Sequence, residues 1–363
     1  MKNWLYAMSV MGLVINLSHT SAQNLGAYTD SRGYFYVFEN GNRNQVETMP
    51  IKYSKVGGNC VLYVDNSDNL KCYYQGDKID VADYPPAMLV NTDDLGAFYN
   101  NRILYVVDHG KTTRMPGWTG NYAIGDSIVG CFDDNNTAYN VYYDGEVKIL
   151  PDVVDTSVRN STIAGDNILV YIAGGGKLKA YYHNKIYDLG TDHPGKYAAG
   201  SSTVAFMDLY SQQFKVFYDG LVAPLESMPP KSFSCGDGII AYVDASNNFK
   251  IFYKGSLMTV FSYAPDNYAV DDNVVAFSVD NVGFNVFYKG KIYKMETTGP
   301  MSYQCDYNSV GYLDAYGYLK MFCDGNTTQC SDVVISKFKL TKNVLMYRTD
   351  LNEFNIFLNG QQY

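Results

Sequence analysis

Aspartate is the side chain with chemical potential that recurs most regularly in this 363-residue sequence. Carboxylates can bind hard cations, and short ones can also accept hydrogen bonds from the backbone of a turn. The stretch DNSDN at 65–69 suggests calcium, but it lacks the glycine and the distant glutamate of a calcium loop. We therefore predict that these residues cap turns and hold no metal. The recurring positions are Asp30, Asp65, Asp134, Asp208, Asp244, Asp280, Asp314 and Asp350.

Groups suited to catalysis are sparse. His109, His183 and His193 are scattered, and none has a partner in the sequence that would complete a triad or a metal cluster. The sequence contains no GxSxG, HExxH or P-loop motif. Some glycosidases of the fold predicted below use a pair of acids, but here the acids are spread by a repeat. We predict no catalysis and no cofactor.

The cysteines leave two alternatives. Cys323 and Cys330 flank the stretch CDGNTTQC and could form a disulfide in an oxidising compartment. The other reading is that they are buried free thiols that pack as small apolar residues. The sequence has no CxxC pair, so zinc and thioredoxin-like sites are not supported.

Repetition organises the whole chain. Phrases such as FKVFYDG, FKIFYKG and FNVFYKG end at Gly220, Gly255 and Gly290, which are 35 residues apart. A weaker copy, LKAYYHN, ends at Asn184. A fixed period of this size predicts a repeat architecture. The glycines at the corresponding position are Gly41, Gly76, Gly110, Gly145, Gly220, Gly255, Gly290, Gly325 and Gly360.

One repeat, 268–297, reads as four short strands (a, b, c and d) joined by tight turns. Its recurring glycine fits a type I′ turn between strands c and d, which needs positive φ at both central residues. Strand c, FNVFY, is apolar on both faces and must be covered on both sides, yet no helical stretch is available. We predict an all-β β-propeller of about ten four-stranded blades. A single ring is favoured over two five-bladed rings.

The N-terminus predicts export. Lys2 precedes an apolar stretch, 4–17, and small residues end at Ala22, so residues 1–22 read as a signal peptide and 23–363 as the propeller. The stretch is too short for a membrane anchor, which is the alternative. Loss of Lys2 changes the net charge from −9 to −10. Such acidity disfavours nucleic acid as a partner.

In a propeller, the d–a connections and b–c turns share one face, here called the loop face. The d–a loops vary between repeats, and variable loops on a constant scaffold are where recognition is usually found. Trp118, the only tryptophan after residue 22, lies there and suits a protein partner or a stacked sugar; the alternative is that it packs a loop. An acidic row at the ends of the b strands would attract a basic partner. The predicted contact residues are Trp118, Pro116, Pro229, Pro230, Tyr263, Asp65, Asp244 and Asp280.

With its signal peptide and ten copies of a [YF]xxGDxxxAYxDxxxxFKVFYxG-like repeat, the chain resembles exported β-propeller repeat proteins of Bacteroidota. Among them it is similar to the family of periplasmic plug proteins of the type 9 secretion translocon. This resemblance implies a periplasmic protein that closes an outer-membrane pore by binding a translocon subunit, without being embedded in the membrane. A secreted or cell-surface location is the alternative. A glycan-binding lectin is the competing function, but a lectin would repeat its binding residues from blade to blade, and Trp118 has no counterpart.

Overall fold

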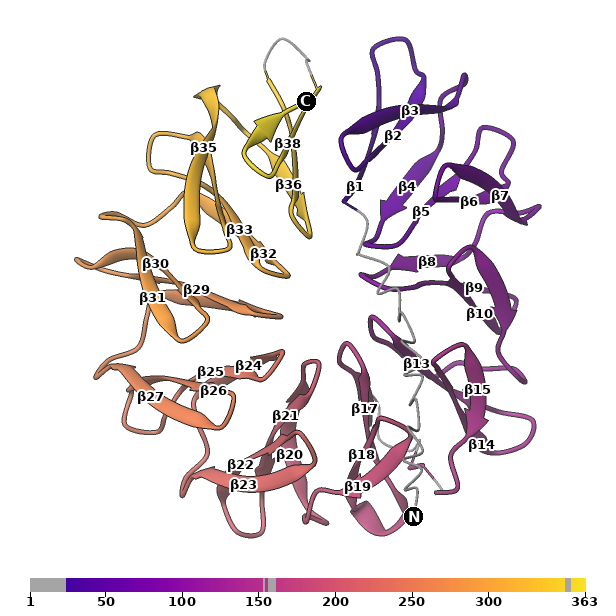
Figure 1. Ribbon diagram of the computed structural model, residues 1–363. Coiled ribbons are helices and arrows are strands. Elements are labelled where there is room, and N and C mark those ends of the chain that lie inside the picture. Colours follow the sequence, from indigo (N-terminus) through magenta and orange to yellow (C-terminus); the bar gives the residue numbers. More distant parts are fainter. Residues whose placement is uncertain (1–23, 153, 156–160, 350–353) are drawn as a thin grey trace, which may run out of the picture.

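The computed structural model describes residues 24–152, 154–155, 161–349 and 354–363. The predicted signal peptide lies outside these residues. Ten antiparallel sheets follow one another around a single closed ring, with the first and last blades side by side (Figure 1). The propeller fold and the preference for one ring are therefore confirmed. No helix in the described part of the chain is long and apolar enough to cross a bilayer.

Blade 1 differs from the others because its sheet has three strands among the described residues, and each other sheet has four. The strands of blades 1 to 5 are β1 (Leu25–Thr29), β2 (Phe35–Glu39), β3 (Asn42–Glu47), β4 (Tyr53–Val56), β5 (Val61–Val64), β6 (Leu70–Tyr74), β7 (Asp77–Ala82), β8 (Met88–Asn91), β9 (Gly96–Asn100), β10 (Ile103–Asp108), β11 (Lys111–Arg114), β12 (Tyr122–Ile124), β13 (Ile128–Asp133), β14 (Ala138–Tyr143), β15 (Glu146–Ile149), β16 (Thr162–Ala164), β17 (Ile168–Ile172), β18 (Leu178–Tyr182) and β19 (Lys185–Asp188). Blade 5 also holds a short 3₁₀ turn, Gly174–Gly176.

Blades 6 to 10 repeat the four-stranded pattern, and the last strand of blade 10 runs almost to the end of the chain. Their strands are β20 (Pro194–Ala199), β21 (Thr203–Asp208), β22 (Gln213–Tyr218), β23 (Leu221–Glu226), β24 (Ser232–Gly236), β25 (Ile239–Val243), β26 (Phe249–Tyr253), β27 (Ser256–Phe261), β28 (Asn267–Asp271), β29 (Val274–Val279), β30 (Gly283–Tyr288), β31 (Lys291–Glu296), β32 (Ser302–Asp306), β33 (Ser309–Leu313), β34 (Tyr318–Cys323), β35 (Asn326–Val334), β36 (Phe338–Thr341), β37 (Val344–Arg348), β38 (Phe354–Leu358) and β39 (Gln361–Gln362).

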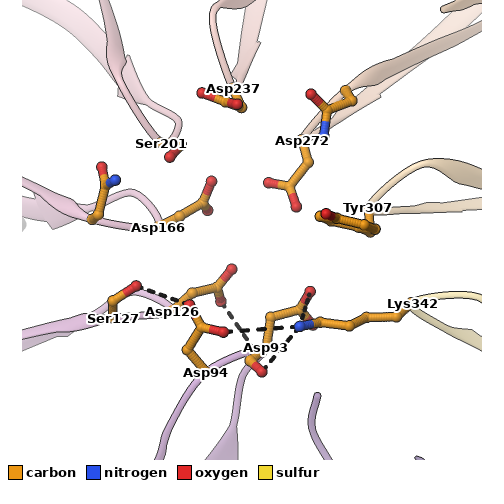
Figure 2. Close-up of a pocket in the computed structure, with 12 residues that line it drawn as sticks. Asp93, Asp94, Asp126, Ser127, Asp166, Ser201, Asp237, Asp272, Tyr307 and Lys342 are labelled. Atoms are coloured by element: carbon orange, nitrogen blue, oxygen red, sulfur yellow. Dashed lines mark hydrogen bonds and ion pairs between the residues drawn. The ribbon is translucent and has the colours of Figure 1, made fainter. Parts of the chain in front are cut away.

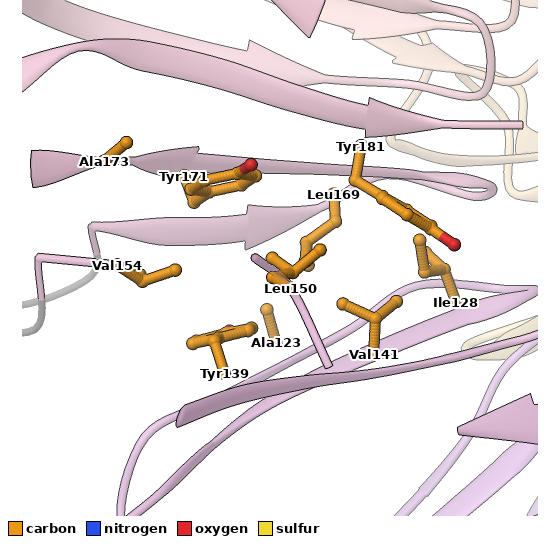
Figure 3. Packing of buried hydrophobic residues seen from close by; sticks show 10 residues of the cluster. All are labelled: Ala123, Ile128, Tyr139, Val141, Leu150, Val154, Leu169, Tyr171, Ala173 and Tyr181. Atoms are coloured by element: carbon orange, nitrogen blue, oxygen red, sulfur yellow. The ribbon is translucent and has the colours of Figure 1, made fainter. Parts of the chain in front are cut away.

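The core lies between blades and forms no single centre. Because each middle strand is apolar on both faces, each blade packs against two neighbours. Figure 3 shows one such layer, where Tyr139 and Val141 of β14 face Leu169 and Tyr171 of β17. Side-chain packing thus stacks the sheets around the ring. This packing fixes the positions of the turns at both ends of every blade.

The c–d turns have the geometry that the glycines predict. All nine of the predicted glycines have positive φ, from 74° at Gly110 to 95° at Gly41. The residue before each also has positive φ, as a type I′ turn requires. In the copy without glycine, His183 and Asn184 occupy the two central positions of the turn and also have positive φ, at 48° and 60°.

Candidate functional site

Trp118 lies on the loop face and is 49% exposed. The guanidinium of Arg102, from the b–c turn of blade 3, stacks over the indole at 5.5 Å from the ring centroid. Arg102 also forms an ion pair of 2.6 Å with Asp134, whose backbone N–H donates to the Trp118 carbonyl oxygen. The indole is therefore held in place by polar neighbours, and about half of its surface remains open to a partner.

The other predicted contact residues divide into exposed and buried ones. Pro116, Tyr263 and Asp280 are exposed, and the Tyr263 ring stacks on Phe261 at 5.2 Å between centroids. Pro229 is half-buried and Pro230 is buried. Since a buried proline ring offers no surface, Pro230 does not belong to the contact set.

The predicted acidic row needs a larger correction. Asp65 and Asp244 are only 8% and 6% exposed, so they do not make the loop face negative. The backbone N–H of Asn248 donates to Asp244, and Lys250 forms an ion pair of 3.0 Å with it. Burial alone would raise the pKa of Asp244, but the hydrogen bonds from Asn248 and Lys250 lower it to about 2. Asp350 lies outside the described residues.

This arrangement is a repeated brace between neighbouring blades. In blade 7, Lys250 also contacts Glu226 of blade 6 at 2.6 Å, and the hydroxyl of Tyr242 donates to the same carboxylate at 2.7 Å. Each brace joins the last strand of one blade to the middle strands of the next. Two further blades repeat it with Asp65, Lys71, Tyr63 and Glu47, and with Asp314, Lys320, Tyr312 and Glu296.

Cys323 and Cys330 are free thiols. Cys330 is buried in the layer between blades 9 and 10, where burial raises the pKa of its thiol to about 12. The alternative of packing thiols therefore describes this structure, and the disulfide does not form in it.

A second site, missed by the sequence analysis, lies on the opposite face. The a–b turns of several blades converge around the central channel and enclose a cavity of about 220 Å³ (Figure 2). We call the carboxylates that line it the acidic mouth. They are Asp93 and Asp94 of blade 3, Asp126 of blade 4, Asp166 of blade 5, Asp237 of blade 7 and Asp272 of blade 8.

Blades from different parts of the sequence meet at this mouth. One carboxylate oxygen from each of Asp93, Asp126 and Asp272 lies within 4.8 Å of the other two. Burial and the mutual repulsion of these groups raise the pKa of Asp93 to about 6 and that of Asp126 to about 7. The pKa of Asp166 is raised by burial and by its contact with Asp272. Asp93, Asp126 and Asp272 lie close enough together to bind a cation jointly.

The acidic mouth already contains one internal cation. Lys342 of blade 10 has a side chain only 7% exposed, and its ammonium lies 3.4 Å from Asp93 and 3.8 Å from Asp94. Gly58 leaves the space for it, since a Cβ at that residue would lie 2.3 Å from Cε of Lys342. The contact joins blade 10 to blade 3. Part of the acidic charge is therefore balanced by the protein itself.

The signal that could have located this mouth is the Gly-Asp pair in the repeat, as in Gly125-Asp126, Gly165-Asp166 and Gly236-Asp237. The glycines allow neighbouring turns to touch, because a Cβ at Gly165 would lie 1.9 Å from the carbonyl oxygen of Gly200. A repeated acid that follows a glycine at the end of the innermost strand lies beside the channel once the ring closes.

The architecture defines a class, the β-propellers with one short blade per repeat and an open loop face. Over residues 19–363 the sequence matches the family model of the 10-bladed beta propeller domain, and the chain belongs to that family. No curated protein matches the sequence.

Three solved structures align with this chain at low sequence identity. AztD of Citrobacter koseri is 10% identical, with a TM-score of 0.40 over 86% of this chain and 95% of that one. The computationally designed Ika8 protein is 12% identical, with a TM-score of 0.35 over 85% and 96%. BamB from Moraxella catarrhalis is 12% identical, with a TM-score of 0.32 over 72% and 93%. All three TM-scores lie below 0.5, and the family assignment rests on the sequence match alone.

Proposed function

We propose that this chain is an exported, non-catalytic propeller that binds a protein partner through its loop face. More specifically, it is proposed to act in the periplasm as a plug that closes an outer-membrane secretion pore. The fold supports the general part, because a propeller presents a broad, rigid surface of loops. The specific part rests on the resemblance of the repeats and the predicted signal peptide to the plug family.

The observation that carries the proposal is the distribution of exposed apolar side chains. Most of the large ones lie at b–c turns, d–a connections and the strand ends beside them, although soluble proteins rarely gather such residues on one face without a binding role. Those on the loop face are Met49, Tyr53, Trp118, Ile149, Leu209, Tyr210, Met228, Tyr263, Met301, Tyr316, Val333 and Val334. At the opposite end, Leu221, Val222, Leu257 and Ile292 flank c–d turns and Tyr307 stands in an a–b turn.

A protein surface fits this face better than a glycan does. Tyr210 and Tyr316, at 85% and 80% exposure, come from blades 6 and 9, and Trp118 comes from the start of blade 4. Such spacing suits a partner that covers much of the disc. One face of the Trp118 indole is occupied by Arg102, which removes a surface on which a sugar would stack. The lectin alternative therefore has less support.

Site-specific cross-linking tests the proposal. A photoreactive amino acid at Tyr210, Trp118 or Tyr316 should cross-link, in the cell envelope of the source organism, to an outer-membrane translocon subunit identified by mass spectrometry. The same group at Leu257 or Ile292 serves as the matched control beside the c–d turns. Cross-links that arise only from those two residues would overturn the choice of face. A partner that is not a pore component would refute the plug and leave protein binding intact.

The absence of catalysis is also part of the proposal. His109 and His193 pair with the preceding aspartates on exposed turns, at 2.5 and 2.8 Å, and do not line the acidic mouth. The strongest enzymatic alternative is acid–base chemistry by the raised-pKa carboxylates of the mouth. A hydrolase screen, glycosidase substrates included, is expected to show no turnover. Turnover that Asp126→Asn abolishes would contradict this part.

A further inference from the structure

In the described part of the chain, blade 1 has a free inner edge. Its sheet consists of β1, β2 and β3, and among the described residues β1 pairs only with β2. In each other blade the strand that corresponds to β1 is the second one and pairs on its inner side with strand a, as β5 pairs with β4. Among the residues that the structure describes, from Asn24 onward, blade 1 thus has no counterpart of the strand that lines the channel in the other blades.

The mature chain cannot supply this strand if the signal peptide is cleaved as predicted. In blade 2, β4 begins at Tyr53 and β5 at Val61, eight residues later. Since β1 begins at Leu25, the corresponding strand would start near residue 17, within the segment removed after Ala22. The chain's other end does not fill the gap, because β39 completes the sheet of blade 10.

The backbone of β1 presents a defined set of hydrogen-bonding groups to the gap. The N–H of Asn40 donates to the carbonyl oxygen of Asn24. By the alternation of an antiparallel ladder, Gly26 and Tyr28 also bond to β2, and Leu25, Ala27 and Thr29 point their N–H and C=O groups inward. One of these groups is already held by a side chain, since Arg348 of blade 10 donates to the carbonyl oxygen of Thr29 at 3.0 Å.

The gap has an apolar wall. A cavity of about 420 Å³ lies between blade 1 and blade 10, lined by Ala27 of β1 and by Phe338, Met346 and Phe354 of blade 10. Tyr28 stacks on Phe354 at 4.2 Å between ring centroids, which ties the two blades together beside the cavity. In a complete blade, side chains of strand a occupy the corresponding layer between blades.

Several side chains around the gap are positively charged, although the whole chain carries a net negative charge. Lys337, Lys339 and Arg348 line the cavity, and Lys55 of β4 stands on the other side of the missing strand. Partial burial and the like charge of Lys55 lower the pKa of Lys339, and the opposite charge of Asp306 offsets this only in part. None of the three lysines forms an ion pair among the residues that the structure describes. A cluster of cations without ion pairs, in a chain of net charge −9, favours an anionic occupant.

We propose that the gap between blades 10 and 1 is a docking groove for one extended, acidic segment of a protein partner, which adds to the free edge of β1 as the missing inner strand. Main-chain hydrogen bonds to Leu25, Ala27 and Thr29 supply affinity, as in other cases of strand addition. An apolar side chain fills the cavity, and carboxylates face Lys55 and Lys339. This proposal rests on the export and cleavage that the proposed function includes, but the groove is separate from the loop face, so it does not depend on the plug role.

A peptide taken from the protein itself is a suitable probe. Residues 266–272, DNYAVDD, contain the inner strand of blade 8 and carry three acidic side chains. Labelled with fluorescein, this peptide should bind the mature chain, 23–363, saturably and at one site in a fluorescence-anisotropy titration. A peptide methylated at alternate backbone nitrogens cannot complete the ladder and is expected not to bind. A peptide with lysines in place of its aspartates is expected not to bind, because its positive charges would be repelled by Lys55 and Lys339.

Protein variants locate the site. Lys339→Glu and Lys55→Glu should each weaken binding by about tenfold or more, equivalent to about 1.4 kcal/mol. Lys254→Glu, at an exposed c–d turn, is the matched control and should bind as the wild type does. Circular dichroism confirms that each variant is folded. Hydrogen exchange should show fast amides at Leu25, Ala27 and Thr29 that become protected when peptide is added.

Three results would overturn the proposal. The first is no saturable binding, or binding that backbone methylation leaves unchanged. The second is protection of the Leu25, Ala27 and Thr29 amides before peptide is added, because the protein's own chain would then fill the edge. The third is an exported protein whose intact mass retains residues 1–22.

Discussion

Lys250 shows how one residue joins two blades. Its ammonium lies between Glu226 and Asp244, and Tyr242 donates to the same glutamate. All four groups are largely buried, so each carboxylate depends on the lysine for neutralisation. The brace explains why an acid and a lysine recur in the repeat without forming a binding surface.

Replacing Lys250 by methionine should therefore be costly. The change keeps the length of the side chain but leaves Glu226 and Asp244 as two neighbouring carboxylates with no cation. We expect a loss of about 3 kcal/mol in the free energy of unfolding, measured by urea denaturation. Lys254→Met, an exposed control in the next turn, should change it by less than about 0.5 kcal/mol. Equal effects of the two substitutions would refute the brace.

Only half of this brace could be predicted from the sequence. A short acid at the end of a strand indicates turn capping, and Asp244 does accept the backbone N–H of Asn248. The contact with Glu226 joins two repeats across their stacked faces. It depends on the stagger between neighbouring blades, which no local pattern in the sequence specifies.

At the scale of the element, two kinds of glycine hold the turns for different reasons. Gly255 has φ +87°, and no atom lies within 4 Å of the position that a Cβ would take there, so its role is conformational. Gly165 has no such φ, but a Cβ there would approach the carbonyl oxygen of Gly200 to 1.9 Å. The first shapes a c–d hairpin, and the second allows the a–b turns of neighbouring blades to touch.

A pair of alanine substitutions should separate these roles. Gly255→Ala places Cβ in open space at an unfavourable φ and should cost about 1 kcal/mol. Gly165→Ala forces two backbones apart in the inner ring and should cost about 3 kcal/mol. Denaturant unfolding of both variants measures the difference. A larger loss from Gly255→Ala than from Gly165→Ala would show that the inner ring tolerates expansion.

The sequence predicted the first kind of glycine and not the second. Asn-Gly and Asp-Gly pairs such as Asn40-Gly41 and Asp144-Gly145 are local signals of a hairpin. The need for Gly165 arises from Gly200 of the next blade, and so it appears only when the blades are stacked. The acidic mouth went unpredicted for the same reason, since Asp126 and Asp272 meet only across the closed ring.

For the whole molecule, closing the ring concentrates like charge at one end of the channel. Asp126 would lose its proton near pH 3.8 in an ordinary setting, whereas burial and its acidic neighbours raise its pKa to about 7. The pKa of Asp271 is raised to about 7 and that of Asp306 to about 8, in both cases by burial first and then by neighbouring acids. The closed ring therefore holds protons that the unfolded chain releases at lower pH.

The free energy of unfolding should consequently fall as the pH rises from 5 to 8. Over that interval these aspartates are already ionised in the unfolded chain but still hold protons in the folded ring. Because the folded state binds more protons than the unfolded state, raising the pH lowers the free energy of unfolding. The carboxylates whose pKa values are lowered, such as Asp244 at about 2, stay ionised throughout and do not contribute. We expect the Tm to be at least about 2 °C lower at pH 8 than at pH 5.

Asp126→Asn assigns this effect to the mouth. Asparagine resembles the protonated acid. The Tm of the variant should therefore equal that of the wild type at pH 5 and exceed it at pH 8. Asp280→Asn, at an exposed b–c turn, is the control and should keep the wild-type dependence. A Tm that rises between pH 5 and pH 8, or an Asp126→Asn variant that parallels the wild type, would mean that repulsion in the mouth does not limit the closed ring. If the Tm of Asp126→Asn alone varies little with pH, repulsion among the carboxylates of the acidic mouth destabilises the closed ring, and Lys342 offsets only part of that repulsion.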